Sequence, residues 1–382
     1  MTTDDGAAFS FSLLSPFYTT TLSSGPVKPH NISYRMLNFA NVALHGLAVH
    51  RVGNKQRAEK NFVSDSLVEP SERLRETLLD YFIKPFKRNT ELYQFVHSSD
   101  LNLNEIYSYA TTLFQQPENL LNESVNILQH LYNQSMHPNI KRGELYVATF
   151  SNVLIDDELV DAVGIFKSER KASFLKVDRE SQRLVLNEQE GINLEKLDKG
   201  CLILNTRRDE GFRVLTVDNN QYDASYWLYQ FLHIDYVEDE NFHTKMYLEM
   251  VNDFAGTVVA PKSDQREKVK VMANTVDYFT TNQVFNEKEF KEHVLADDTE
   301  LWNEFDSYRA DQGLEKTEDF QISAHALKAA KRKIKTTIKL DTNIRIKLDA
   351  GDPQSTEEYI ERGYDEEQGM SFYKIYFNEE LE

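Results

Sequence analysis

The chain has few of the features that would assign it to a catalytic class. Its 382 residues include one cysteine, Cys201, which excludes an intramolecular disulfide and a zinc site built from spaced cysteines. It contains no P-loop, no glycine-rich dinucleotide loop and no Gly-x-Ser-x-Gly motif. Cys201 lies in an apolar run, which predicts a buried thiol. These absences argue against catalysis.

Long apolar runs are also absent. No stretch approaches the roughly 18 apolar residues of a membrane span, and the sequence does not begin with a basic region followed by an apolar stretch. We therefore expect a cytoplasmic protein without a membrane span or secretory signal. The 40% hydrophobic content predicts a globular protein, and 382 residues are enough for two or three domains. The net charge of −19 opposes general attraction to nucleic acid, so any contact with DNA requires a local basic patch.

The most informative stretch is residues 144–217, where short apolar runs alternate with turn and charge signals. This pattern predicts consecutive antiparallel strands. The runs are Leu145–Phe150, Leu159–Phe166, Phe174–Val177, Leu184–Leu186, Cys201–Leu204 and Phe212–Val217. In the first two runs, odd and even positions are both largely apolar, so both faces of the sheet should be covered. The sequence thus predicts an α+β fold with a central antiparallel β-meander covered by helices.

The order of the other elements predicts four regions. Residues 1–30 form a flexible N-terminal arm, 31–222 an α+β domain, 223–335 a mainly helical region, and 336–382 a C-terminal β-hairpin with an acidic loop and tail. In the helical region, aromatic and methionine residues recur every four positions and are interpreted as core rather than as a ligand pocket. They are Phe242, Met246, Met250 and Phe254.

Two histidines in the first predicted strand are of a type that can bind metal. His45 and His50 lie on the strand predicted over Asn41–His50. Their odd spacing of five should point them to opposite faces, so they make a poor metal pair. We predict no metal ligand in the chain.

The clearest charge signal lies between Ser323 and Leu348, where Asp341 is the only acid and the local charge is +7. From Thr336 to Leu348, Ile or Leu alternates with polar and basic residues. This predicts one long strand, or a hairpin bent near Asp341–Asn343, with a basic outer face. The candidate DNA-binding residues of this segment are Lys328, Lys331, Arg332, Lys333, Lys335, Lys339, Arg345 and Lys347.

The tail that follows is acidic. From Asp349 onward, eleven acids face only Arg362 and Lys374, a sum of −9. Phe372–Phe377 is predicted to pair with the basic strand across a glycine-containing loop. The acidic tail either screens the basic face or keeps the protein soluble.

One weak catalytic pattern is present. Asp157, Glu169 and Lys171 occur in the order of restriction-type nucleases, in which two carboxylates hold Mg²⁺ beside a lysine. Chance matches to so short a pattern are common in a chain with 27% charged residues. We interpret all three residues as turn charges.

Several segments in a shared order resemble the bacterial nucleoid-associated protein family of the NdpA type. The resemblance extends in patches over about residues 40–380 and includes a helical stretch from Phe231 to Phe254. Its other segments are Val42–His45, Asp65–Pro70, Gly143–Leu145, Leu159–Lys167 and Thr337–Leu340. It implies a cytoplasmic protein of the bacterial chromosome that contacts double-stranded DNA or DNA-bound proteins, with no enzymatic activity and no cofactor. The arm before Asn38 and the long segment Glu180–Asn205 depart from the pattern expected for the family.

Three functions remain open at this point. The first is binding of double-stranded DNA by the basic residues, without strong sequence specificity. The second is an acidic adaptor that acts on DNA-processing proteins and mimics DNA charge. The third, weaker than both, is the Mg²⁺-dependent nuclease. A homodimer is a further partner hypothesis, and no membrane partner is expected.

Overall fold

The computed structural model describes residues 37–88, 91–220, 226–296, 298–311, 318–332, 334, 337–348 and 359–379. All described residues belong to one compact unit, Arg35–Glu382. The predicted arm over residues 1–30 lies outside the described residues. No helix of the described residues has the length and apolarity needed to cross a membrane.

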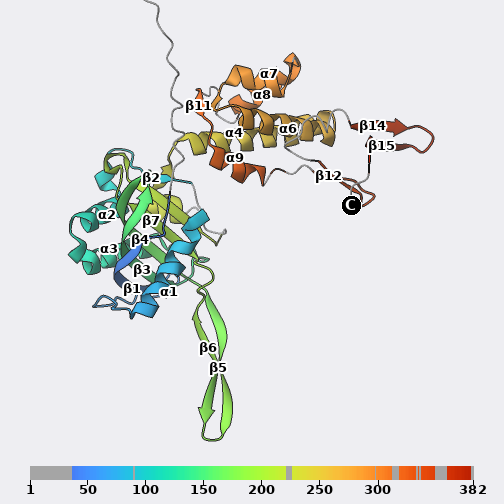
Figure 1. Cartoon of the computed structure of the whole chain (residues 1–382). Coiled ribbons are helices and arrows are strands. Elements are labelled where there is room, and N and C mark those ends of the chain that lie inside the picture. Colours follow the sequence, from blue (N-terminus) through green and yellow to red (C-terminus); the bar gives the residue numbers. More distant parts are fainter. Residues whose placement is uncertain are drawn as a thin grey trace, which may run out of the picture. The chain divides into compact units, whose positions relative to one another are not determined.

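A seven-stranded antiparallel sheet forms the centre of the first half of this unit (Figure 1). Four of the predicted runs are consecutive neighbours in it, which confirms the predicted meander and the α+β class. In spatial order the strands are β1 (Ala43–Val52), β3 (Gly143–Ile155), β4 (Glu158–Ser168), β7 (Lys199–Leu204), β8 (Arg213–Asp218), β2 (Tyr93–Phe95) and β9 (Ile234–Tyr236).

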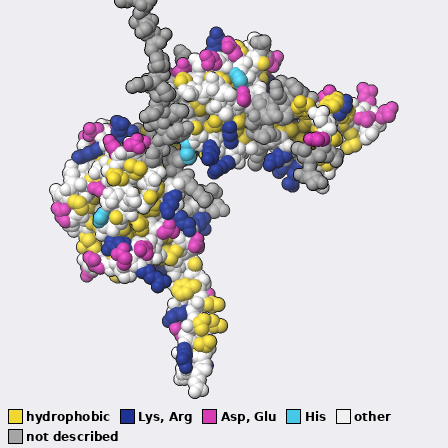
Figure 2. All heavy atoms as spheres, viewed as in Figure 1, with side chains coloured by type: hydrophobic (Ala, Val, Ile, Leu, Met, Phe, Trp, Pro, Cys, Tyr) yellow, Lys and Arg dark blue, Asp and Glu magenta, His cyan; other side chains and the backbone are white. Residues whose placement is uncertain are grey.

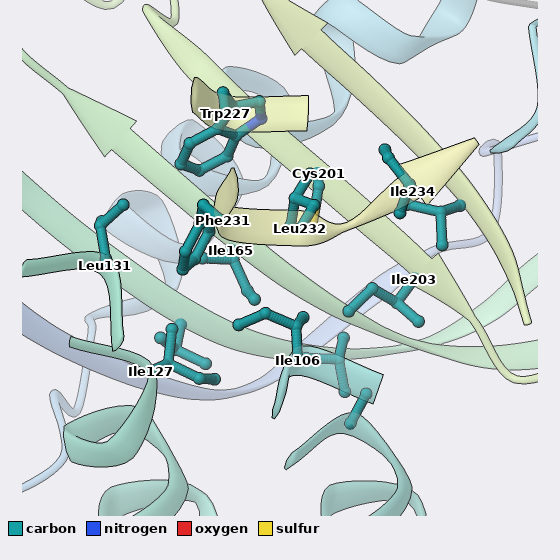
Figure 3. Packing of buried hydrophobic residues seen from close by; sticks show 14 of the residues in the cluster. Ile106, Ile127, Leu131, Ile165, Cys201, Ile203, Trp227, Phe231, Leu232 and Ile234 are labelled. Atoms are coloured by element: carbon teal, nitrogen blue, oxygen red, sulfur yellow. The ribbon is translucent and has the colours of Figure 1, made fainter. Parts of the chain in front are cut away.

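Both faces of the sheet are buried, as the sequence predicts. Leu145 and Val147 of β3 lie in one core, and Tyr146 and Ala148 lie in the other, because successive side chains of a strand point to opposite faces. The first core, part of which Figure 3 shows, also contains the buried thiol of Cys201. It is closed by α2 (Glu105–Gln115), α3 (Leu120–Gln134) and the π-helical segment Tyr226–Leu232; the second is closed by α1 (Glu72–Ile83) and the 3-10 helix Lys84–Arg88.

Two predicted runs form strands but not strands of the covered sheet. They belong to β5 (Lys171–Glu180) and β6 (Arg183–Ile192), which pair only with each other. The prediction that helices cover them is therefore wrong. Strands β4 and β7 pair directly, so the hairpin between them leaves the sheet. Figure 1 shows it as a long two-stranded ribbon.

The second half of the unit is built from helices around an aromatic core. Its elements are α4 (Glu240–Phe254), the π-helical segment Ala255–Val259, α5 (Ala260–Lys262), α6 (Gln265–Thr281), β10 (Val284–Phe285), α7 (Glu287–Val294), α8 (Thr299–Asp311), β11 (Phe320–Gln321) and α9 (Ala324–Lys331). Of the four-residue stripe, Met250 and Phe254 enter this core. Phe242 and Met246 are only partly buried and line a cavity of about 400 Å³, so the interpretation as core holds for half of the stripe.

The C-terminal region contains two short hairpins instead of one. The basic alternation bends into β12 (Thr337–Lys339) and β13 (Arg345–Lys347). The predicted pairing of this segment with Phe372–Phe377 is wrong, because β15 (Met370–Ile375) pairs with β14 (Ile360–Asp365). Local turn chemistry explains the choice. The Asp365 carboxylate accepts the N–H groups of Glu367 and Gln368, and Gly369 has φ +66°, which closes a tight turn between neighbouring segments.

The two histidines of β1 lie in different environments. His45 is exposed, and its Nε2 lies 2.6 Å from Ser151 Oγ. His50 is 2% exposed, its Nδ1 accepts the Ser64 N–H at 3.0 Å, and its Nε2 lies 2.8 Å from Ser124 Oγ. Burial lowers the pKa of His50 below its usual 6.5. The fold therefore holds this imidazole neutral.

This neutral imidazole predicts a loss of stability in acid. Because the pKa of His50 is lower in the folded than in the unfolded chain, the unfolded chain binds the proton first as the pH falls. The contribution is complete above pH 6.5 and is lost as the pH falls toward the lowered folded value. Urea unfolding at about pH 7.5 and about pH 5 should show a smaller loss for His50→Gln than for the wild type. The exposed control His45→Gln should keep the wild-type loss; equal losses in all three proteins would contradict the assignment.

Candidate nucleic-acid interface

The first part of the predicted basic segment is the helix α9. Its N-cap is Ser323, whose Oγ accepts the Ala326 N–H at 3.1 Å. Ala326 and Leu327 are buried, with Leu327 in the aromatic core. The remaining side carries three exposed cations, which line a hollow of about 370 Å³ together with Ala324 and Leu327: Lys328, Lys331 and Arg332.

The second part is the β12–β13 hairpin. Ile338 is 2% exposed and pairs directly with Ile346, so this face of the hairpin is apolar and turned inward. Lys339 pairs directly with Arg345, and Lys347, two residues further along β13, pairs with Thr337. Alternation places these three exposed cations on the face opposite Ile338. Like charges directly opposite each other destabilise a strand pair, so the Lys339–Arg345 pairing leaves a repulsion in the free protein.

We call Lys328, Lys331, Arg332, Lys339, Arg345 and Lys347 the basic face. Lys331 Nζ donates a hydrogen bond to Thr280 Oγ1 at 2.8 Å. None of the six forms an ion pair with another described residue. The predicted residues Lys333 and Lys335 lie outside the described residues.

The two parts of the basic face are close in space. Six residue steps separate Lys331 from Thr337, which limits the gap to about 22 Å. Figure 2 shows dark-blue side chains at α9 and again at β12. A straight duplex presents about one phosphate charge per 1.7 Å of its axis. A single duplex can therefore reach both parts.

The described portion of the acidic tail pairs elsewhere. In the β14–β15 hairpin, Lys374 Nζ lies 3.7 Å from Glu361 Oε2. Arg362 Nη1 of the same hairpin lies 4.0 Å from Asp264 Oδ2. The Arg266 guanidinium donates to the Ile360 carbonyl at 3.2 Å, which attaches this hairpin to the start of α6. Among the described residues, no acid of these two strands forms an ion pair with the basic face.

The nuclease pattern is not assembled. Asp157 has φ +66° in the turn that precedes β4, whereas Glu169 follows the other end of that strand. An eleven-residue strand spans more than about 30 Å, so the two carboxylates cannot share a Mg²⁺ ion. Lys171 Nζ instead lies 3.1 Å from Glu144 Oε1.

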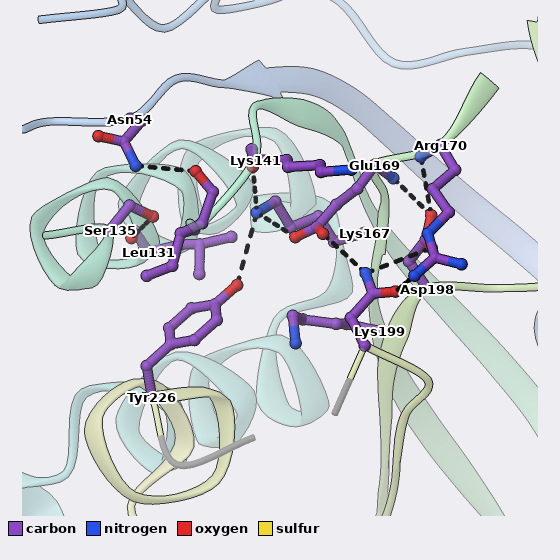
Figure 4. A network of polar contacts seen from close by, with 12 residues as sticks. Asn54, Leu131, Ser135, Lys141, Lys167, Glu169, Arg170, Asp198, Lys199 and Tyr226 are labelled. Carbon is purple, nitrogen blue, oxygen red and sulfur yellow. Dashed lines mark hydrogen bonds and ion pairs between the residues drawn. The ribbon is translucent and has the colours of Figure 1, made fainter. Parts of the chain in front are cut away.

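Glu169 belongs to a buried charge network that sequence reasoning missed (Figure 4). Lys167 is completely buried, and its Nζ donates to Glu169 Oε1 and to the Lys141 carbonyl, both at 2.7 Å. Burial lowers the pKa of Lys167, while the Glu169 carboxylate acts in the opposite direction. The Tyr226 hydroxyl, 3.5 Å from the same ammonium, closes the site on one side.

The network fastens the root of the β5–β6 hairpin. Asp198 Oδ2 accepts the N–H groups of Glu169 at 2.6 Å and Arg170 at 3.0 Å, which fixes the connection from β4 to β5. Lys199 Nζ lies 2.6 Å from Asp218 Oδ2, which ties β7 to the end of β8. The described residues contain no group of three or more His, Cys, Asp or Glu side chains able to hold a metal ion. The contacts therefore assign the network a structural role.

The comparison with protein families agrees with this architecture. The family described as nucleoid-associated protein YejK matches residues 48–369, well over half of the chain. The chain belongs to this family of nucleoid-associated proteins, which confirms the resemblance in the sequence. The matched range contains both the basic face and the β5–β6 hairpin. A comparison with curated proteins finds no match.

The network predicts a large effect of one neutral substitution. Asp218→Asn leaves the ammonium of Lys199, which is 1% exposed, without its carboxylate. Removing one partner of a buried ion pair costs about 3–5 kcal/mol of unfolding free energy. The control Lys84→Ala breaks the exposed ion pair with Glu195 and should cost at most about 1 kcal/mol. Urea unfolding measures the free energy of unfolding of each variant, and equal losses in the two variants would contradict the structural role of the network.

Proposed function

We propose that this protein binds double-stranded DNA through the basic face, without strong sequence specificity and without cleaving the DNA. Membership of a nucleoid-associated family supports the proposal. The observation that carries it is the direct pairing of Lys339 with Arg345 on an exposed face whose cations form no ion pair with a described residue. A polyanion removes the repulsion that this pairing leaves in the free protein.

Counterion release supplies the free energy. Each phosphate that a lysine or arginine neutralises frees condensed cations, so binding weakens linearly with the logarithm of salt concentration. If all six cations of the basic face contact phosphates, the slope is about −5. Phosphate contacts position a protein without reading sequence, which agrees with the absence of specificity in the proposal.

The charge on the rest of the chain limits the affinity. The net charge of −19 repels a duplex at long range, whereas the local charge of +7 attracts it at short range. Binding should therefore be modest at physiological salt and steeply salt-dependent.

The adaptor function remains the second candidate. The turn between β14 and β15 carries exposed acids at Glu366 and Glu367, and no basic residue of the described chain pairs with them in an ion pair. Such a surface would suit a basic DNA-processing protein. It predicts partner binding that survives removal of DNA.

The DNA proposal predicts a specific change in salt dependence. Lys339, Arg345 and Lys347 are replaced together by alanine, and binding to a random duplex is measured over a salt series without Mg²⁺. The slope of log affinity against log salt should become less negative by between about 2 and 3, because up to three phosphate contacts are lost. The control replaces Lys55, Lys84 and Lys87, which are exposed on the sheet half of the unit, by alanine. It changes the net charge equally and should leave the slope unchanged.

Three outcomes would reject parts of the proposal. Equal slopes for both triple variants would remove the β12–β13 hairpin from the interface. No binding by the wild type at low salt would favour the adaptor. Cleavage of the duplex on addition of Mg²⁺ would show an enzymatic activity that the proposal excludes.

A further inference from the structure

One face of the β5–β6 hairpin is apolar and exposed. Val177 pairs directly with Leu186, and these side chains are 57% and 66% exposed. Leu175 and Leu184 lie two positions along their strands from this pair and therefore share its face; they are 69% and 73% exposed. Figure 2 shows hydrophobic side chains gathered on the ribbon that Figure 1 labels β5 and β6.

The opposite face of the same hairpin is satisfied within the chain. Lys176 Nζ lies 2.9 Å from Asp178 Oδ1, and the amide of Asn187 donates to Asp178 Oδ2 at 3.1 Å. The Phe174 ring lies against Gly191, where an added Cβ would come within 3.1 Å of it. The two faces therefore differ: the first is apolar, whereas the second is mostly polar and carries one half-exposed ring, that of Phe174.

Exposure of this apolar face to water is unfavourable, which indicates that the face binds a partner. A two-stranded ribbon is at best marginally stable in water unless its apolar face packs against something. The buried network holds the root of the ribbon, but each strand is ten residues long and extends about 33 Å. The contiguous apolar patch on the outer part of the ribbon is of the kind that marks an interaction site.

Charge identifies the occupant. Lys171–Ile192 contains four basic and four acidic residues, so the hairpin is neutral in a chain of −19. Lys171 forms an ion pair with Glu144 of β3, and Lys176 and Arg183 form ion pairs within the hairpin. The hairpin charges that form no ion pair with a described residue are Arg179, Glu188 and Glu190. Arg179 pairs in register with Leu184, and Glu188 with Leu175, so these two charges lie on the apolar face on opposite sides of the Val177–Leu186 pair.

We propose that this face binds the same face of a second copy of the chain. A two-fold axis that lies midway between the two faces and crosses the strands at right angles at the Val177–Leu186 pair places the Arg179 end of one hairpin over the Glu188 end of the other. Arg179 then lies beside the partner's Glu188, and the contact occurs twice. The apolar side chains of both copies are buried between the two pairs.

The balance of charge favours this occupant over DNA. Equal numbers of acids and bases give the hairpin no net attraction to phosphates. A neutral surface is also where two molecules of −19 meet with the least repulsion. The proposal does not rest on DNA binding, because no residue of the basic face takes part.

Sedimentation velocity over a wide concentration range tests the surface. The full-length wild type should dimerise, and Leu186→Glu should raise the dimer dissociation constant at least about tenfold by placing a charge at the centre of the contact. The control Gln189→Glu adds the same charge to the same strand on the satisfied face and should dimerise normally. A monomeric wild type, or a Leu186→Glu variant that dimerises as tightly as wild type, would overturn the proposal.

A charge exchange tests the orientation. Arg179→Glu and Glu188→Arg should each weaken the dimer, and the double variant should recover most of the wild-type affinity because the pairs reform with reversed sign. Failure of the double variant to recover would reject the antiparallel arrangement.

Cross-linking provides a readout that does not depend on weakening the hairpin. Stacked sheets lie about 10 Å apart, beyond the reach of a disulfide, so Val177→Cys should be joined to the partner's Val177→Cys by a bis-maleimide linker of about that length. The native Cys201 is buried and should not react. Gln189→Cys, on the other face, should remain uncross-linked; equal cross-linking of both variants would contradict the proposal.

Discussion

Burial of both faces of the central sheet is the constraint on which the rest of the structure depends. Because Leu145 and Tyr146 enter different cores, helices must lie on both sides of β3 and its neighbours. The buried charged side chains of these strands then lie near the strand ends. Lys167 and Lys199 are such residues, and their burial requires the carboxylates of Glu169 and Asp218. The charge network, and with it the root of the β5–β6 hairpin, follows from the packing of the sheet.

Local sequence patterns predict well which segments form strands, but they do not predict which strands pair with each other. The runs at Leu145–Phe150 and Phe174–Val177 look alike in composition, yet only the first is buried. What separates them is the direct pairing of β4 with β7, a contact between residues far apart in the chain. The same holds in the C-terminal region. Alternation leaves open one long strand or a hairpin bent near Asp341–Asn343, and the structure has the hairpin. The partner of β15 depends on a turn at Asp365.

The candidate sites divide in the same way. Composition reveals the basic cluster, because +7 within a short segment of a −19 chain is visible without a structure. That Lys339 faces Arg345 follows only from the register of the hairpin. The buried charge network could not be predicted from the sequence, because Lys167 and Asp198 are distant in the chain and each has the pattern of an ordinary charge at a strand end. The exposed face of β5–β6 was also missed, because the sequence pattern assigns its apolar residues to the core.

The two proposed surfaces have complementary physical consequences. A single basic face with about six phosphate contacts on an acidic chain gives modest affinity. A dimer joined through the neutral hairpins would carry two basic faces, and the second would bind at a high effective concentration once the first is bound. The gain requires no new contact with DNA and depends only on whether both faces can reach phosphates together. Self-association would thus offset the electrostatic cost of the acidic chain, and a neutral, apolar hairpin is the kind of surface on which two such chains can meet.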